Sequence, residues 1–576
     1  MTLATIVLTL LALPAAFIVW SARSLVSNQA KAEQAGFPIL VRWVTPTNPL
    51  WMIFGSTIVR KCRALNIGTE NFWTYYVFGW EANQRHLAHQ KYGEVFMLVT
   101  PGGNWLCVND AEVIYDVLRR RTEFTRNLVQ FDVLNVYGTN LSTTEGVDWQ
   151  KHRKVTAVTF TEKNNELVWK QSLAQAKGML EYWTERAPQP LRTIGEDTKV
   201  FTLNVLAAAL FDKMYPFEGA SEPKASHVKD DSYTYRDSLN RILKNIIPLF
   251  IFGGPGLQAW WTPKSWKQAG EAVTIFRTYV TGLIAEERSL MARGIQDNRN
   301  LVATLVRACE KEEQEINAIP LAKRQGSDRK MTLTEQEIIS NLFVFAFAGN
   351  DTTAIVMTHI VVDMTAHPEI QEWIAEEIHH YLPSANTSEW AFDTYPKLKR
   401  CLAVVMESLR LNHPLGQLAK TTENRSPTIT IASKAYTLPP DTSVHLSLSA
   451  LHTHSRYWGA DSMTWNPKRF ISYSANAPKT IENEVLAADT SEHYLAWAWG
   501  QRVCPGKKFS QVELVATLAT LFYKHTVQPE LREGETLEQA RKRVYQAGLD
   551  IEHEGKILHE MREPESTCLV WKERKG

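Results

Sequence analysis

A cysteine near the C-terminal end stands in a stretch whose residue types could hold a metal. The stretch reads Trp497-Ala498-Trp499-Gly500-Gln501-Arg502-Val503-Cys504-Pro505-Gly506, and an apolar helical pattern follows it. Amide donors and the dipole at a helix start favour thiolate over thiol, and glycine lets a flat ligand approach the backbone closely. The pattern therefore indicates that Cys504 ligates a metal, although a lone cysteine is more often a small buried hydrophobe.

The glycines around this cysteine also have some features of a phosphate-binding loop. One residue too many separates Gly500 from Gly506, and Lys508 stands where a Ser or Thr would bind magnesium. We therefore reject the nucleotide-binding interpretation.

A second candidate site lies in the middle of a long predicted helix. Thr334 and Glu337 form a capping-box pattern and no proline occurs until Pro368, which predicts about thirty residues of helix, about 45–50 Å long. Residues 343–354 are apolar on all sides and then abruptly polar, and Gly349 costs about 1 kcal/mol relative to alanine. Such a departure from local rules indicates a functional site, with a structural kink as the alternative.

Together the two stretches resemble the cytochrome P450 superfamily, most closely its fungal microsomal members. The cysteine stretch is similar to the haem-binding loop of that family, with Trp497 where Phe is usual and Ala498 where Gly is common. The resemblance implies that Cys504 is the axial ligand of haem b (heme b, iron protoporphyrin IX). It also implies that Trp497, Gly500, Arg502 and Gly506 help to bind this cofactor.

Residues 348–353 resemble the distal oxygen-binding motif of the same family. The resemblance implies that Thr352 donates a hydrogen bond to dioxygen and that Asp351 helps to relay protons. Gly349 would make room for oxygen and substrate.

Three further side chains could bind the haem propionates. Trp149 and Arg153 begin a predicted helix at i and i+4 on one face, where a surface stack of the two is the alternative. In the resembled family both donate to a propionate, and an indole N–H and a guanidinium suit a carboxylate. Lys420 falls where the family usually has an arginine for the same purpose, but it is a point charge and not a fork.

Glu407 and Arg410 stand at i and i+3 of another predicted helix. An exposed pair of this kind is common and worth under about 1 kcal/mol. The resemblance implies instead that Glu407, Arg410 and Arg469 form a buried network that locks the region around the haem loop. Lys468 stands where Glu is frequent, outside these three residues.

The fold class that these patterns and the resemblance imply is mainly α with small β-sheets, the cytochrome P450 fold. Apolar strings at 95–99 and 105–108, around Pro101-Gly102-Gly103, predict a hairpin between helices. Residues 412–418 are expected to pass the cofactor and shape the substrate pocket. Phe343, Phe347 and the region 124–139 indicate that this pocket is apolar.

The N-terminal residues predict a membrane anchor. Leu3 to Trp20 is almost unbroken apolar sequence, and the first cations, Arg23 and Lys31, follow it, so the positive-inside rule keeps the rest on the cytoplasmic face. A cleaved signal peptide is the alternative and would need a basic start. We expect a transmembrane anchor at 1–22, a membrane-proximal linker and N-terminal region at 23–77, and a haem-binding catalytic domain at 78–576.

Residues 211–330 are the least informative. Ile246–Phe252 and Trp260-Trp261 could line a lipophilic entrance or dip into a membrane, but ordinary core packing is the simpler account. Residues 310–330 are charge-rich and predict a solvated loop.

Composition excludes several other classes of protein. Lys and Arg number 63 and Asp and Glu 62, a formal net charge of +1, so nothing in the overall balance calls for nucleic acid. The 6 cysteines lack CxxC spacing, which argues against zinc ribbons and against a disulfide scaffold. No Gly/Ser/Pro-rich linker divides the 576 residues, so one large catalytic body is the simplest organisation.

The resemblance implies a haem-thiolate monooxygenase that inserts one oxygen atom of O2 into a lipophilic small molecule in secondary-metabolite biosynthesis. No dinucleotide fingerprint accompanies the motifs, so electrons would come from a separate NADPH–cytochrome P450 reductase, with cytochrome b5 as a second donor. The expected location is the endoplasmic reticulum membrane. The basic residues that could dock the reductase, or simply form a solvated face, are Lys151, Lys154, Lys507 and Lys508.

Two other functions of the same fold are left open. One is an oxygen-independent isomerase or dehydratase, which would not need the Asp351-Thr352 relay. The other is a non-catalytic haem-binding protein, which would need neither the relay nor a reductase.

Overall fold

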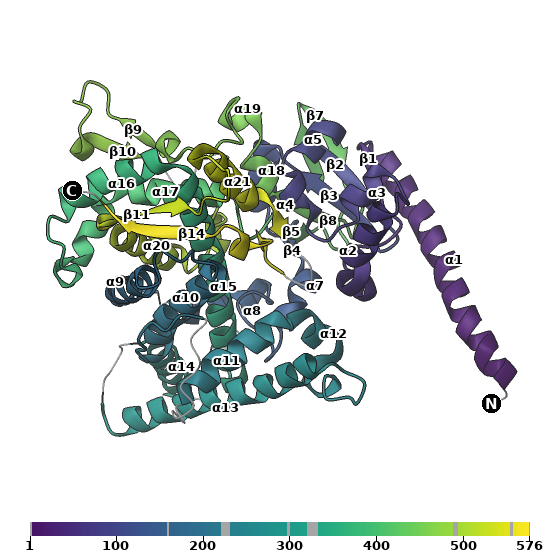
Figure 1. Ribbon diagram of the computed structural model, residues 1–576. Coiled ribbons are helices and arrows are strands. Elements are labelled where there is room, and N and C mark those ends of the chain that lie inside the picture. The colour runs from purple at the N-terminus through teal and green to yellow at the C-terminus, as the bar shows by residue number, and fades with distance from the viewer. Residues whose placement is uncertain are drawn as a thin grey trace.

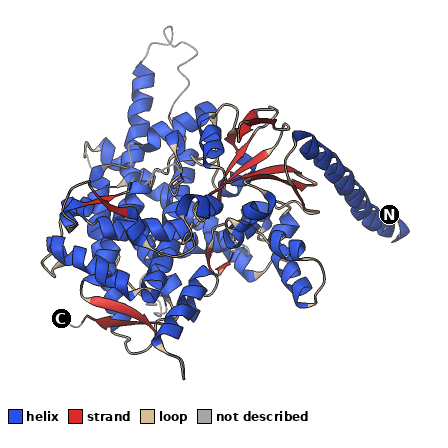
Figure 2. Cartoon of the chain, turned by 90° about the horizontal axis from the view of Figure 1, so that it is seen from above, coloured by secondary structure: helices blue, strands red, loops and turns tan. Residues whose placement is uncertain are grey.

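The computed structural model describes residues 3–157, 160–220, 231–295, 300–318, 332–487, 493–552 and 557–574. Most of these residues form helices, with the largest sheet at one end of the helical body and α1 (Leu3–Ala35) extending away from it (Figure 1; Figure 2). This architecture confirms the mainly helical fold with small sheets that the sequence predicts.

The sheet collects strands from distant parts of the chain. Within the described residues, a six-stranded sheet has the order β1 (Ile39–Val41), β2 (Val95–Thr100), β3 (Gly103–Val108), β8 (Ser443–Ser447), β5 (Gln417–Thr421) and β4 (Thr125–Arg126). The β2–β3 hairpin pairs Val95 with Val108 and Thr100 with Gly103, so the predicted hairpin is confirmed. At the other edge, β4 and β5 pair antiparallel and set Arg126 opposite Lys420.

Smaller two-stranded sheets complete the β structure. They are β6 (Thr428–Ile431) with β7 (Lys434–Thr437), β9 (Ile471–Tyr473) with β10 (Glu484–Leu486), β11 (His525–Pro529) with β14 (Leu569–Glu573), and β12 (Ile551–Glu552) with β13 (Glu560–Met561).

One group of helices lies around the sheet, and a second group forms the body (Figure 1). The first group is α2 (Pro49–Ala64), α3 (Glu70–Tyr75), α4 (Trp80–Gln84), α5 (Leu87–Tyr92), α6 (Ala111–Arg119), α7 (Leu128–Phe131), α18 (Leu448–Leu451) and α19 (Ser455–Trp458). The second is α8 (Gly146–Ala157), α9 (Glu162–Thr184), α10 (Ile194–Phe211), α11 (Asp231–Lys244), α12 (Ile246–Gly256), α13 (Lys264–Ala292), α14 (Leu301–Ala318), α15 (Glu335–Ala366), α16 (Pro368–Tyr381), α17 (Lys399–Leu411), α20 (Lys507–Tyr523) and α21 (Leu537–Leu549).

The long helix α15 is the central element of the body (Figure 1). Thr334 and Glu337 form the predicted capping box, and the helix has 32 residues, about 48 Å at 1.5 Å per residue. It packs against α10, α17, α20 and α21, and most of its residues are buried on every side. The length, start and end of this helix are therefore as predicted.

Two regions of the structure differ from what the sequence predicts. The charged loop predicted at 310–330 is wrong for residues 310–318, because they continue α14, and the rest lies outside the described residues. Trp260 is 90% exposed and Trp261 is 52% exposed, so these two residues are not ordinary core, whereas Ile246, Ile247 and Leu249 are buried.

The N-terminal segment is one continuous helix through the expected boundary at residues 22 and 23. Its C-terminal part packs on the sheet, where the Asn28 side-chain amide donates to the Thr100 carbonyl oxygen over 2.9 Å. Among the described residues, the helix with the length and hydropathy of a membrane span is α15, and most of α15 is buried inside the protein. The membrane anchor at 1–22 therefore stays a prediction.

Candidate active site

The Cys504 loop precedes α20 and folds back on itself. The Cys504 amide donates to the Trp497 carbonyl oxygen over 2.9 Å, which closes the loop. Ala498 and Gly500 have φ of +60° and +70°, the left-handed region in which glycine is relaxed and alanine is strained. Cys504 is exposed, although Trp497 and Phe509 on either side of it are buried. The loop thus presents a thiol at the edge of the core.

The residues that lead into this loop are each held by a hydrogen bond to a different part of the protein. The bonds join Tyr494 Oη to Met406 O (3.0 Å), Leu495 N to His452 Nε2 (3.0 Å), His413 Nε2 to Ala496 O (2.7 Å) and Trp497 Nε1 to Ser510 Oγ (3.2 Å). Because the Ala496 carbonyl can only accept, His413 carries its proton on Nε2. Sequence analysis missed the roles of His413 and His452, since no local pattern marks either residue.

The structure brings Glu407, Arg410 and Arg469 together. Arg410 makes a bidentate pair with Glu407 at 2.7 and 2.9 Å, both side chains are fully buried, and Arg469 Nε lies 3.1 Å from the same carboxylate. Arg410 Nη1 also donates to the carbonyl oxygen of His452 over 2.7 Å. Since the His452 ring accepts from Leu495, the network connects directly to the Cys504 loop.

One face of α15 is open within an otherwise buried stretch. Ala348 is exposed and Thr352 is partly exposed, and residues at i and i+4 share a helix face. The Thr352 hydroxyl donates to the Ala348 carbonyl oxygen, so its lone pairs remain as acceptors. This exposed face of α15 can border a ligand.

Gly349 lies against α10. A Cβ at Gly349 would lie 2.9 Å from a methyl carbon of Leu206, which is too close for a real contact. The glycine therefore lets α10 and α15 approach each other. Its expected role beside oxygen and substrate stays a prediction.

Asp351 occupies a different face of the helix and is tied to α10. Its carboxylate accepts from Asn350 Nδ2 over 2.8 Å, and Asn350 Oδ1 accepts from Thr202 Oγ1 over 2.7 Å. Desolvation raises the pKa of Asp351 from 3.8 to about 6, while the charge of Lys199 opposes this rise and that of Glu560 adds to it. A carboxyl with a pKa near neutrality can carry and release protons.

Arg502 joins the Cys504 loop to α8. It pairs with Glu145 at 2.7 Å, donates to the Thr144 carbonyl oxygen over 3.0 Å, and lies 4.2 Å from the ring centre of Trp149. The structure therefore brings Trp149 and Arg502 into contact. Arg153 on the same helix is close enough for its charge to lower the pKa of both Arg502 and Cys504.

Lys420 and Arg126 extend this group of cations. The pKa of Lys420 is lowered to about 8 and that of Arg126 to about 9, mainly by desolvation, and the charge of Arg502 acts in the same direction on both. Glu145 is the carboxylate that raises the pKa of all three cations. Buried cations that share one carboxylate favour a further anionic group.

Arg126 also has an unsatisfied donor. Among the described residues, its Nε is buried without a hydrogen-bond partner. A haem propionate placed here would satisfy it, so the donor set fits the cofactor that the sequence implies. Sequence analysis missed Arg126, because its place in the site depends on the pairing of β4 with β5. Its partner across this pair, Lys420, lies 294 residues further along the chain.

The protonation of Cys504 differs from the simple expectation. The Gly506 amide and the charges of Arg153 and Lys507 favour the thiolate as predicted. Part of the residue is exposed, but the surrounding protein atoms still desolvate the thiol, and this raises its pKa in the protein alone. The helix start is therefore not sufficient to make a thiolate. A bound metal cation reverses this balance, because a coordinating thiol is deprotonated.

The expected basic docking face is only partly available. Lys151 pairs with Glu337 at 2.6 Å and Lys508 pairs with Glu162 at 2.9 Å. Lys507 lies 5.9 Å from the ring centre of Trp497, beside the Cys504 loop. Lys151 and Lys508 are thus engaged in ion pairs.

Comparisons with known proteins show the family of this chain. A sequence model of the cytochrome P450 family matches residues 71–547. A cytochrome P450 monooxygenase of Arthrobotrys oligospora is 26% identical over 90% of this chain and 91% of its own length. The phomenoic acid biosynthesis cluster cytochrome P450 monooxygenase of Leptosphaeria maculans is 26% identical over 94% of this chain and 95% of its own length. Secologanin synthase 1 of Catharanthus roseus is 26% identical over 73% of this chain and 74% of its own length.

The chain belongs to the cytochrome P450 family. It is an enzyme of the monooxygenase kind, as its relatives are, and family membership implies a haem-thiolate cofactor. Within that family, the individual roles of the residues described above stay predictions.

Proposed function

We propose that the chain oxygenates a lipophilic small molecule, by hydroxylation, epoxidation or several successive oxidations. The observation that carries the proposal is the open Ala348–Thr352 face of α15, which has a buried carboxyl of raised pKa, Asp351, directly beside it. Haem b bound through Cys504 would supply activated oxygen, since thiolate ligation favours O–O cleavage. Thr352 would orient oxygen on this face, and Asp351 would deliver protons toward the Thr352 hydroxyl.

The cation cluster would hold the cofactor. Arg126, Arg153, Lys420 and Arg502 would bind the propionates, and Trp149 would keep Arg502 in place through the contact between their side chains. The tethered backbone from Tyr494 to Trp497 would fix the position of Cys504. Rigid support of this kind holds a ligand within the small tolerance that catalysis requires.

The substrate is expected to come from secondary metabolism. The relative from Leptosphaeria maculans is named for a biosynthetic cluster, which supports this class without identifying the molecule. The largely buried Phe347 on α15 supports an apolar pocket, whereas Phe343 is fully buried against Tyr137 and Phe276 and is part of the core.

Electrons would come from an NADPH–cytochrome P450 reductase, with cytochrome b5 as a second donor. The reductase would approach the side of the Cys504 loop that carries Lys507. We also propose that residues 1–22 anchor the chain in the endoplasmic reticulum membrane, with the catalytic domain on the cytoplasmic face. The exposed Trp260 and Trp261 support contact of a second segment with lipid.

The proposal is tested with the purified full chain, reconstituted with haem, reductase and NADPH under ¹⁸O2. We expect one ¹⁸O atom to enter a lipophilic pathway intermediate, with NADPH consumed in proportion. Product formed without oxygen would favour the isomerase or dehydratase alternative. Haem binding without any product or NADPH consumption would favour the non-catalytic alternative.

A further inference from the structure

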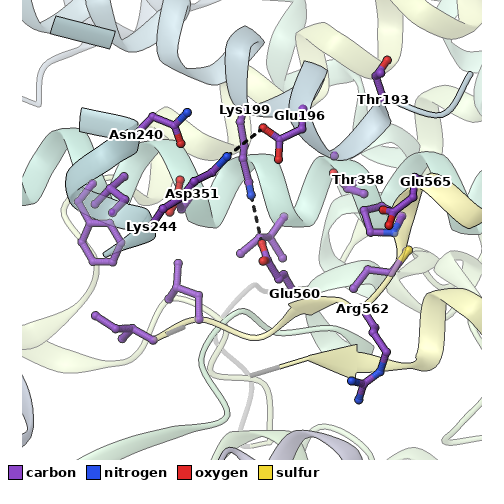
Figure 3. Close-up of a pocket in the computed structure, with 18 of the residues that line it drawn as sticks. Thr193, Glu196, Lys199, Asn240, Lys244, Asp351, Thr358, Glu560, Arg562 and Glu565 are labelled. Atoms are coloured by element: carbon purple, nitrogen blue, oxygen red, sulfur yellow. Dashed lines mark hydrogen bonds and ion pairs between the residues drawn. The ribbon is translucent and has the colours of Figure 1, made fainter. Parts of the chain in front are cut away.

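A cavity of about 660 Å³ lies beside Asp351 (Figure 3). It is enclosed by α10, α11, α15 and the C-terminal segment 557–565, and its wall combines apolar side chains with charged ones. This volume can hold many water molecules, each of which occupies about 30 Å³ in the liquid. The charged side chains that line it are Arg192, Glu196, Lys199, Lys244, Asp351, Glu560, Arg562 and Glu565.

The two ion pairs in this cavity differ in burial. Lys244 and Glu196 are 3.6 Å apart at the rim, with side chains 55% and 53% exposed. Lys199 and Glu560 are 3.3 Å apart further in, with side chains 26% and 15% exposed. The Lys244–Glu196 pair is therefore open to water, and the Lys199–Glu560 pair is partly shielded from it.

The charge of Lys199 interacts with three carboxyl groups, those of Glu560, Asp351 and Glu196. Its ammonium is directed to Glu560, while Asp351 enters the same cavity from α15 (Figure 3). The two members of the pair act on Asp351 in opposite directions, because Lys199 lowers its pKa and Glu560 raises it. Of the other lining groups, Glu196 also raises it. An ion pair so placed can set how readily Asp351 carries a proton.

We propose that Lys199 and Glu560 are positioning residues that set how readily Asp351 exchanges protons with water in this cavity. Glu560 holds the Lys199 ammonium away from Asp351, which leaves the Asp351 carboxyl able to carry a proton. The inference rests on the proposed monooxygenase function.

The proton balance is simple. Asp351 gives one proton toward the Thr352 hydroxyl and becomes a carboxylate, and water in the cavity returns one proton to it from bulk solvent. One monooxygenation takes two such protons, with two electrons from NADPH through the reductase, and releases one oxygen atom of O2 as water. Asp351 therefore works twice in each cycle and is unchanged at its end.

The test measures the protonation of Asp351 in the full-length holoprotein by infrared pH titration. The carboxyl C=O band of Asp351 is identified by its absence in Asp351→Asn. Glu560→Gln removes the charge that restrains Lys199, so we expect the titration midpoint to fall from about 6 by about one pH unit. Lys199→Gln removes the opposing cation, so we expect the midpoint to rise by about one pH unit.

Three further variants separate this inference from a general structural effect. Glu560→Asp keeps the charge and should keep the midpoint close to that of the wild type. The double variant Lys199→Gln with Glu560→Gln should lie between the two single variants. Glu166→Gln, which removes a carboxylate from the exposed pair with Lys170 on α9, should change nothing.

The pH dependence of NADPH consumption with purified reductase should move in the same two directions as the midpoint. If the wild type forms product but the midpoints of the variants are unchanged, the inference is overturned. A shift of both single variants in the same direction would also overturn it. Failure of the wild type to incorporate oxygen would overturn the proposed function instead. The two failures are therefore distinguishable.

Discussion

The Cys504 side and the Asp351 side of the site are built in different ways. On the Cys504 side, backbone and side-chain hydrogen bonds tie the segment from Tyr494 to Trp497. Arg410 and Glu407 are fully buried and lie 2.7 Å apart. On the Asp351 side, ion pairs of 3.3 and 3.6 Å line a cavity that water can reach. The first arrangement fixes geometry, and the second leaves charges able to respond to solvent.

This difference predicts two classes of variant. Changes on the Cys504 side should reduce stability and haem retention without moving the pH profile of turnover. Changes on the Asp351 side should move the pH profile and leave the spectrum of the bound haem unaltered. A variant that produced both effects would break the comparison.

The largest effect is expected from Arg410→Met. It leaves the buried Glu407 carboxylate with a weaker set of partners, and breaking a buried ion pair costs about 3–5 kcal/mol. Denaturant unfolding of the purified chain should show this loss, together with little retained haem. Lys170→Met removes an exposed partner of Glu166 at 2.7 Å and should cost under about 1 kcal/mol. Equal costs for the two variants would mean that burial of the network is unimportant.

Asp351→Asn should lower coupled turnover about a hundredfold, the lower range for loss of a general acid. The same variant should change stability with pH. In the folded protein, the pKa of Asp351 is raised from 3.8 to about 6. The ionised carboxyl therefore destabilises the folded state, and this cost is largest once the pH has risen above about 6.

The gain in unfolding free energy from Asp351→Asn should therefore be larger at pH 8, up to about 3 kcal/mol, than at pH 5. Thermal unfolding at the two pH values measures this difference. Asp393→Asn, at an exposed aspartate, is the matched control. A gain from Asp351→Asn that is independent of pH would contradict the raised pKa of Asp351.

Arg126→Gln should weaken cofactor binding about tenfold, because a charge-assisted hydrogen bond to a propionate contributes about 1.5–3 kcal/mol and the amide recovers part of it. Transfer of haem to apomyoglobin measures the rate of loss. Arg60→Gln, a distant arginine on α2, should leave the rate unchanged. If Arg126→Gln also leaves it unchanged, Arg126 is not a propionate ligand.

The smallest effect is expected from Ala498→Gly. Ala498 has φ of +60°, and relief of the left-handed strain should stabilise the loop by about 1 kcal/mol. A small rise in unfolding temperature of the holoprotein would show this. A fall would mean that the methyl group of Ala498 contributes packing worth more than the strain.

The sequence predicts features that depend on local pattern. The capping box at Thr334, the length of α15, and the β2–β3 hairpin each follow from residues within one element. The charged residues of 310–318 misled the prediction, because charges suit an exposed helix face as well as a loop. The spacing in the Cys504 loop was recognisable because all its residues are neighbours in sequence.

Features that depend on tertiary contacts were not predictable in this way. Lys199 and Glu560 are 361 residues apart, and the bond from His413 to Ala496 spans 83 residues. Nothing in the local pattern of either partner marks such a contact. For the same reason, Arg126 became a candidate ligand only after β4 was placed beside β5.

The most direct test of the account is the spectrum of the reduced, CO-bound holoprotein. We expect a thiolate-type Soret band in the wild type and its loss in Cys504→Ser, with Cys568→Ser as the control that keeps it. A histidine-type band in the wild type, or an unchanged band in Cys504→Ser, would contradict the central claim that Cys504 is the axial ligand.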